Sequence, residues 1–186
     1  MIFRTVGKKY SDDSPALVYI QFIINQKPTD QCSMSFVVCN MGNVIKESLQ
    51  VATTLFYNRH PEYFAGKASI ISVSSSIAYS SPYLTSLFLF AFMCKKYNMW
   101  NFDKCVIYGD IDINGNSSNE SFSITEPFKL KYPDYKHLYN MSYNDIEKYL
   151  AATKIQRIYL STNFESNNFV NDDFNSNEDE NLMVYI

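Results

Sequence analysis

Residues 41–52 read Met-Gly-Asn-Val-Ile-Lys-Glu-Ser-Leu-Gln-Val-Ala and mark the start of the first predicted helix. We expect this helix to run from about Val44 to about Asn58. Its apolar residues recur at three- and four-residue spacing, as on the buried face of an amphipathic helix: Val44, Ile45, Leu49, Ala52, Leu55 and Phe56. Pro61 follows soon after and breaks the helical pattern.

The segments before this helix predict two strands. Residues 16–25 are rich in β-branched and aromatic side chains, and residues 33–40 form a second run of this kind. The Lys-Pro-Thr-Asp sequence at 27–30 is a turn signal, so we expect the two strands to pair as a hairpin. Residues 1–15 are polar and are predicted to be a loosely held lead-in.

After the helix we expect a strand at 68–73, a serine-rich loop that ends at Ser81, and a helix from Pro82 to Tyr97. Proline suits the first turn of a helix, and a serine directly before it is a good N-cap. Apolar residues cover nearly all of the surface from Leu84 to Met93. A helix that is apolar all round belongs in the centre of a core.

The rest of the chain predicts strands at 104–108 and 111–113, a long polar connection at 116–140, a helix at 145–152 and a strand at 157–161. This order of elements indicates an α/β domain with a mixed sheet packed with helices. We place the single domain at residues 1–164. The acidic, Asn-rich tail at 165–186 is expected to be disordered.

Four of these segments resemble, in the same order, the proteolytic domain of Lon-type ATP-dependent proteases. Residues 41–52 are similar to the family's Leu-Gly-Asp-Val-Met-Lys-Glu-Ser-x-Gln-x-Ala run, and residues 69–73 to the strand before its active-site loop. Residues 107–115 (Ile-Tyr-Gly-Asp-Ile-Asp-Ile-Asn-Gly) look like its Met-Thr-Gly-Glu-Ile-Thr-Leu-x-Gly hairpin. Residues 146–152 look like its Lys-Glu-Lys-x-x-Ala-Ala helix.

The resemblance spans about residues 16–164 and implies a Lon-protease-like α/β fold of the ribosomal-protein/GHMP type. The N-terminal domain of magnesium-chelatase-like AAA+ proteins shares this fold, and its landmarks match nearly as well. The sequence does not distinguish a Lon-type origin from a magnesium-chelatase-like one. No Gly-x-x-x-x-Gly-Lys-Ser/Thr phosphate loop is present, so we expect no ATPase module within this sequence.

The resemblance also implies where catalytic residues would lie. In the family, a serine within Asp-Gly-Pro-Ser-Ala-Gly is the nucleophile, and a lysine after a Gly-Gly pair is its base. The matching positions here are Leu84 or Tyr83 for the serine and Ile146 for the lysine, and Tyr108 replaces a supporting threonine. None of these residues is a serine or a lysine, so both members of the dyad are missing at the matching positions. We therefore expect no catalytic residues at these positions.

A shifted alignment leaves an alternative open, a divergent, ATP-independent Ser/Lys peptidase. Its nucleophile would be Ser81, although Thr85 and Ser86 are also nearby, and its base would be Lys148 or Lys129. The ordinary interpretation is that Ser81 caps the helix and that Lys148 is a solvated helix-surface residue.

A third pattern lies at residues 151–157, Ala-Ala-Thr-Lys-Ile-Gln-Arg, which resemble the opening of a calmodulin-binding IQ motif. The basic residue expected further along is missing, because that position is Leu160, and no Gly-x-x-x-Arg follows. We interpret the segment as the end of a helix followed by a strand. A calmodulin-like partner at 151–160 stays a separate hypothesis.

The composition argues against nucleic-acid binding, a cysteine metal site and a membrane-spanning helix. All 16 basic residues lie in the first 157 positions, together with 13 of the 19 acidic ones, and the bases form no clustered patch for nucleic acid. The four cysteines form no CxxC pair, so neither a metal nor a cofactor is implied, and buried thiols are expected. The longest apolar run, 83–94, is too short to cross a membrane.

The sequence as a whole predicts a non-catalytic domain that acts as a structural or adaptor subunit of a larger assembly. Its partners would be other protein subunits, and a homo-oligomer stays open. No secretory leader is recognised, so we expect an intracellular, reducing compartment, the cytoplasm or the mitochondrion.

Overall fold

The computed structural model describes residues 1–9, 11–25, 35–38, 43–64, 68–74, 79–80, 84–99, 101–118 and 125–169. The chain divides into two compact units, Met1–Leu150 and Ala151–Ile186. The first unit contains both sheets, helices α1 to α4 and the start of α5, and the described part of the second unit is the rest of α5.

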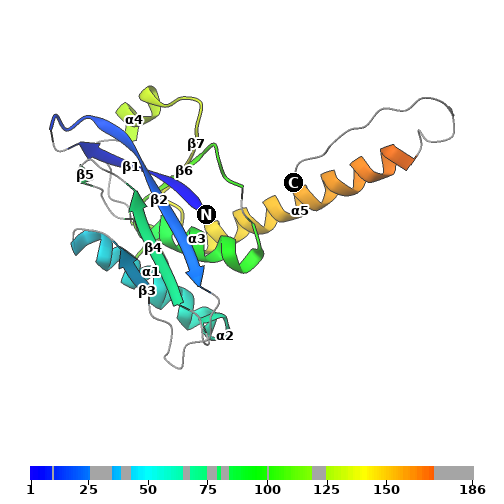
Figure 1. Cartoon of the computed structure of the whole chain (residues 1–186), viewed down its shortest axis with the longest axis horizontal. Coiled ribbons are helices and arrows are strands. Elements are labelled where there is room, and N and C mark those ends of the chain that lie inside the picture. The colour runs from blue at the N-terminus through cyan, green and yellow to red at the C-terminus, as the bar shows by residue number, and fades with distance from the viewer. Residues whose placement is uncertain are drawn as a thin grey trace. The chain divides into compact units, whose positions relative to one another are not determined.

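The larger sheet has five strands in the order β3-β4-β2-β1-β5 (Figure 1). These strands are β1 (Ile2–Lys9), β2 (Pro15–Asn25), β3 (Ser35–Val38), β4 (Ala68–Ser74) and β5 (Tyr79–Ser80). β2 pairs antiparallel with both β1 and β4, whereas β3 runs parallel to β4. Along β2 the buried residues alternate with more exposed ones, as expected for a strand with one face on the core: Ala16, Val18, Ile20 and Phe22 are buried.

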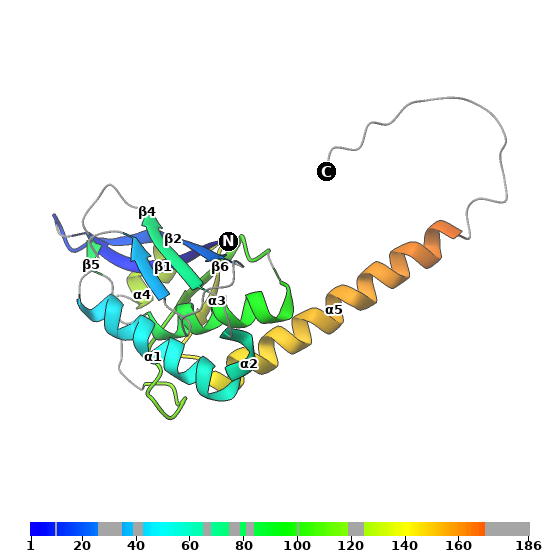
Figure 2. The ribbon, with the colours of Figure 1, turned by 60° about the horizontal axis from the view of Figure 1, so that its bottom comes forward.

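Two long helices, α1 (Asn43–Arg59) and α3 (Thr85–Tyr97), lie against one face of this sheet (Figure 2). Every residue of α3 from Thr85 to Cys94 is buried. Aromatic rings join the layers, because Phe92 of α3 meets Phe22 of β2 edge-on at 5.2 Å and stacks on Phe56 of α1 at 5.5 Å. α3 therefore forms the centre of the main core.

A second, smaller core lies around the two-stranded parallel sheet of β6 (Cys105–Tyr108) and β7 (Lys136–Tyr139). Its buried members are Val6, Val106, Tyr108 and Phe128. Phe128 belongs to the short helix α4 (Thr125–Lys131), and Val6 comes from β1. The remaining helices are α2 (Pro61–Phe64) and α5 (Tyr143–Phe169).

Several sequence predictions are confirmed. The strands at 16–25, 68–73 and 104–108 and the helix at 44–58 lie within one or two residues of β2, β4, β6 and α1. The apolar helix is α3, in the core as predicted, and the domain is a mixed α/β structure. Cys94 and Cys105 are buried thiols, also as predicted.

The predicted hairpin of 16–25 with 33–40 is wrong. β4 lies between β2 and β3, and β3 is parallel to β4. A parallel pair needs a crossover connection, which α1 provides between them, so the turn signal at 27–30 does not join neighbouring strands. The loosely held lead-in is also wrong, because Ile2–Lys9 pairs with both β2 and β5 and buries Phe3, Thr5 and Val6.

Three predictions in the second half of the chain are corrected. The polar connection at 116–140 contains α4 and β7, which bury Phe128 and Leu138. The strand expected at 111–113 is reduced to one bridge between Ile111 and Ser117. The strand expected at 157–161 is part of α5, which continues from the predicted helix at 145–152 without a break.

Some predictions fall on residues outside the described ranges, among them Ser81, Pro82, Tyr83 and residues 170–186 of the tail. Residues 165–169 of that tail are helical. Among the described helices, none combines the length and the apolar character that a membrane crossing needs.

Candidate functional site

The first turn of α3 is fixed by side chains from two other parts of the chain. The backbone N–H of Leu84 donates a hydrogen bond of 3.1 Å to the hydroxyl of Ser48 on α1. The hydroxyl of Thr85 donates to the carboxylate of Asp110 at 2.6 Å. The N-terminal N–H groups of a helix lack intrahelical acceptors, so a hydroxyl supplied by α1 satisfies one of them inside the core.

Gly109 brings the 107–115 segment close to this turn. Its φ is +126°, and a Cβ atom added there would lie 2.9 Å from the backbone nitrogen of Asn140. The carbonyl of Gly109 also accepts a hydrogen bond of 3.3 Å from the N–H of Ser86. Only glycine combines that backbone conformation with so close an approach. The result is a tightly packed junction at the start of α3, formed by Ser48, Leu84, Thr85, Gly109 and Asp110.

Three of the positions to which the Lon resemblance assigns catalytic residues are buried, and a fourth, Tyr83, lies outside the described residues. Leu84 is 1% exposed and Ile146 is 0% exposed, and both belong to the main apolar core. Tyr108 is 1% exposed and stacks on Tyr139 in the smaller core at a ring distance of 4.9 Å. These three side chains pack in the interior, and none of them is a serine or a lysine.

The fallback pairing of Ser81 with Lys148 or Lys129 involves a serine that the structure does not describe. Lys148 is exposed on α5, and Ser81 lies outside the described residues. Lys129 on α4 forms an ion pair of 3.0 Å with Glu126. Among the described residues, the buried hydroxyl of Ser86 has no hydrogen-bond partner, so no described lysine activates it.

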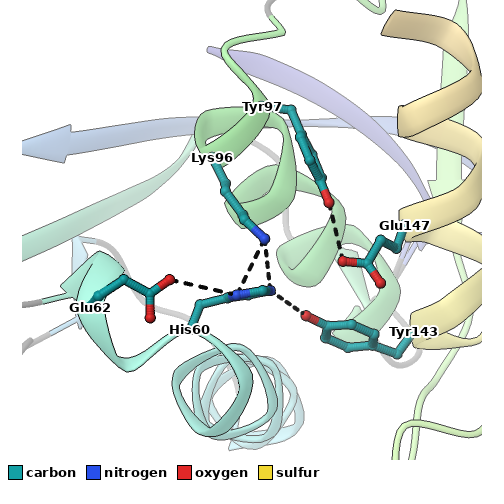
Figure 3. A network of polar contacts seen from close by, with 6 residues as sticks. All are labelled: His60, Glu62, Lys96, Tyr97, Tyr143 and Glu147. Atoms are coloured by element: carbon teal, nitrogen blue, oxygen red, sulfur yellow. Dashed lines mark hydrogen bonds and ion pairs between the residues drawn. The ribbon is translucent and has the colours of Figure 1, made fainter. Parts of the chain in front are cut away.

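A polar network lies elsewhere in the same unit, where four helices meet (Figure 3). Its centre is His60, directly after α1. The ammonium group of Lys96 on α3 lies 3.2 Å from Nδ1 and 3.1 Å from Nε2 of the imidazole. Nε2 is also 2.9 Å from the hydroxyl of Tyr143 on α5, and Nδ1 is 3.8 Å from the carboxylate of Glu62 on α2.

The network continues through neighbouring side chains. The hydroxyl of Tyr97 donates to Glu147 at 3.1 Å, and the guanidinium of Arg59 lies 3.7 Å from the centre of the Tyr143 ring. Arg59 also donates to the side-chain oxygen of Asn144 at 3.3 Å. These contacts join the end of α1 and the end of α3 to the first turns of α5.

Burial and charge set the protonation states in this network. Burial, followed by the positive charge of Lys96, lowers the pKa of His60 below its ordinary value of 6.5. Burial and the nearby Glu147 raise the pKa of Tyr143 to about 12. A neutral imidazole beside a protonated phenol is therefore the state at neutral pH. In either tautomer one ring nitrogen is left to accept a hydrogen bond from Lys96.

The sequence did not identify this network, because its members are distant in the chain and follow no motif. The available signal was a histidine placed between the end of a predicted helix and Pro61. The arrangement holds helices together, and it places no nucleophilic serine or cysteine beside the His60–Lys96 pair in the described contacts. No group of three or more His, Cys, Asp or Glu side chains suited to a metal ion occurs among the described residues.

Comparison with protein-family models and with curated proteins finds no match to this chain. The functional assignment therefore depends on the residues and their geometry.

Proposed function

We propose that the chain is a non-catalytic, Lon-protease-like domain that acts as a structural or adaptor subunit of a larger protein assembly. The observation that carries the proposal is the burial of Leu84 and Ile146 in the apolar core. An active Ser/Lys site needs both groups at a surface that the substrate can reach, with the amine within hydrogen-bond distance of the hydroxyl.

The residues that carry the resemblance support the same proposal. Ser48, Gly109 and Asp110 belong to the segments at 41–52 and 107–115, and each has a contact that holds the start of α3. Scaffold contacts of this kind are independent of catalysis, so a chain that has lost the dyad would still need them for folding.

Under this proposal the domain binds other protein subunits, and its exposed apolar residues are the first place to look for a binding surface. Large apolar side chains are exposed at several places on the described surface, for example Leu130 on α4, at 81% exposure, and Ile113 in the loop after β6. Apolar residues on a surface are ordinary when they are single, so these positions alone define no interface. They are suitable control positions for binding experiments.

The test is covalent labelling of the folded full chain with a serine-reactive phosphonate, read by intact mass. We expect no adduct, because the Ser86 hydroxyl at the start of α3 has no hydrogen-bond partner among the described residues and therefore no base to activate it. A stoichiometric adduct that disappears in Ser81→Ala or Ser86→Ala would establish the peptidase alternative. Lys148→Met and Lys129→Met would then identify the base, since only the variant lacking that base would lose labelling.

A further inference from the structure

The loop that follows β6 contains the one Asn-Gly pair of the sequence, Asn114-Gly115. In such a pair the backbone nitrogen of the glycine approaches the side-chain amide of the asparagine easily, because glycine has no Cβ atom to hinder it. Asn114 is exposed, so water reaches its side chain. The loop therefore carries a covalent reactivity of its own, separate from the polar network around His60.

The structure requires a glycine at the second position of this pair. Gly115 has a φ of +92°, and a Cβ atom added there would lie 3.2 Å from both Nη2 of Arg59 and Cβ of Tyr143. The carbonyl of Gly115 accepts a hydrogen bond of 2.9 Å from the N–H of Tyr143, the first residue of α5. The first N–H groups of a helix lack intrahelical acceptors, and the loop supplies one. Tyr143 in turn contacts His60 through its hydroxyl (Figure 3).

Asp112 holds the pair in place. Its backbone carbonyl accepts the N–H of Gly115 at 2.9 Å, and its carboxylate accepts the N–H groups of Asn114 and Asn116, both at 2.9 Å. These hydrogen bonds, with that from the Asn116 N–H first, lower the pKa of Asp112, so the carboxylate is charged at neutral pH. The Gly115 nitrogen has to give up its proton before it can attack. Its hydrogen bond and the nearby negative charge both oppose that loss.

We propose that Asn114 is a deamidation site, restrained by Asp112, whose isoaspartate product loosens the start of α5. The Gly115 nitrogen attacks Cγ of Asn114, so that a C–N bond forms and a five-membered imide closes. The bond from Cγ to Nδ2 breaks, and ammonia leaves with the proton of the Gly115 nitrogen. Water then opens the imide, at Cγ to give aspartate or at the main-chain carbonyl carbon to give isoaspartate. No oxidant or reductant is needed.

The two products differ in their effect on the loop. Aspartate leaves the main chain as it was and adds one negative charge near Asp112. Isoaspartate carries the main chain through Cβ and Cγ, which adds one atom between the α-carbons of residues 114 and 115. Gly115 fits closely beside Arg59 and Tyr143, so it cannot absorb that added length without moving. We expect the hydrogen bond between the Tyr143 N–H and the Gly115 carbonyl to break in the isoaspartate form.

The test follows residue 114 by peptide mass mapping while the folded full chain is incubated at neutral pH. A sample unfolded in urea serves as the clock, and the incubation lasts until that sample has converted completely. We expect the folded chain to convert more slowly than this sample, but measurably. Asn114→Gln is the matched control and should show no conversion, because its longer side chain would have to close a six-membered ring.

A second variant tests the restraint. Asp112→Ala removes the carboxylate that holds the loop closed, and we expect residue 114 to convert at least about fivefold faster in this variant, because the open loop becomes more populated. The isoaspartate form, separated by ion-exchange chromatography, should show faster hydrogen exchange in the first turn of α5 than Asn114→Asp, which carries the charge without the added atom.

Three results would overturn the proposal. The first is an unconverted Asn114, in both the folded chain and Asp112→Ala, when the urea sample is fully converted. The second is an equal rate in the folded chain and in Asp112→Ala, which would remove the restraint. The third is an isoaspartate form whose α5 exchanges like that of Asn114→Asp, which would remove the link to the helix.

Discussion

The hydroxyl of Ser48 accepts a hydrogen bond of 3.1 Å from the backbone N–H of Leu84, which lies 36 positions later in the sequence. Ser48 belongs to the Lys-Glu-Ser part of the 41–52 segment, and Leu84 is the position that the Lon resemblance assigns to the catalytic serine. The contact lies inside the core, where an unpaired N–H has no water to bond. Ser48, which carries part of the Lon resemblance in the sequence, thus has a structural task at the position that the resemblance matches to the catalytic serine.

Replacing Ser48 with alanine leaves the buried Leu84 N–H without this acceptor. We expect the free energy of unfolding to fall by roughly 1–3 kcal/mol, the cost of an unsatisfied buried donor. Urea denaturation measures the change. Glu47→Ala is the matched control, because Glu47 is exposed in the same turn of α1 and should change stability by less than about 0.5 kcal/mol. An equal fall in the free energy of unfolding for the two variants would show that the Ser48–Leu84 hydrogen bond does not stabilise the fold more than an exposed side chain does.

Replacing Gly109 with alanine forces a Cβ atom to within 2.9 Å of the Asn140 backbone at a positive φ. Strain of this kind costs about 1–3 kcal/mol. We expect a lower thermal midpoint for Gly109→Ala and an unchanged midpoint for Lys104→Ala, an exposed control near β6. A Gly109→Ala protein as stable as the original would mean that the junction can relax around a side chain.

Protonation of His60 should destabilise the fold below neutral pH. Because its pKa in the folded protein is lowered from 6.5, the unfolded chain binds the proton first as pH falls. The stability contributed by neutral His60 is present above about pH 6.5 and is lost as pH falls through the lowered folded value. Hydrogen bonds lower the pKa values of Asp112 and Asp145 below 3.8, so these carboxylates titrate outside this pH window.

Urea denaturation at a series of pH values between 7 and 5 measures this effect. We expect His60→Gln to flatten the decline, and Lys96→Met to reduce it by less, since burial is the larger cause of the shift. Identical slopes for the original chain and His60→Gln would contradict the assignment.

The start of α5 is held by a reciprocal cap. The Asp145 N–H donates to the Ser142 hydroxyl at 3.2 Å, and the Ser142 N–H and hydroxyl donate to the Asp145 carboxylate at 3.1 and 2.6 Å. Loss of such a cap costs about 1 kcal/mol. We therefore expect Ser142→Ala to lower stability by that amount.

Thermal unfolding followed by circular dichroism measures the Ser142→Ala effect, and Ser142→Thr tests its origin. Threonine is also an N-cap residue and keeps the hydroxyl that donates to Asp145, so this variant should recover most of the loss. If the threonine variant is as unstable as the alanine variant, the cap is not the cause.

Local patterns predicted the elements whose signal lies within one segment. The apolar run of α3, the helical spacing of α1 and the β-branched residues of β2 each define a face that must be buried, whatever the neighbours are. Which strands pair with each other was harder to predict, because the turn signal at 27–30 does not show that β4 lies between β2 and β3. The order of strands in the sheet depends on contacts between distant segments.

The candidate site also combines features that the sequence predicts with features that it does not. The sequence shows that positions 84 and 146 are apolar, but it does not predict the hydrogen bonds of Ser48 and of His60. A hydrogen bond across 36 positions, or from His60 to Tyr143 across 83, leaves no spacing pattern. Residues 157–161 are predicted to be a strand, and Ile158 and Tyr159 are residue types that are enriched in strands, yet α5 continues through them.

The central claim, that the chain carries no peptidase, is tested most directly by turnover. The purified full chain is incubated for a day with an unfolded protein substrate, and the products are read by mass spectrometry beside a Ser81→Ala, Ser86→Ala double variant. We predict that the original chain produces no cleavage above the level of the variant. Peptide products formed by the original chain and absent with the double variant would contradict that claim.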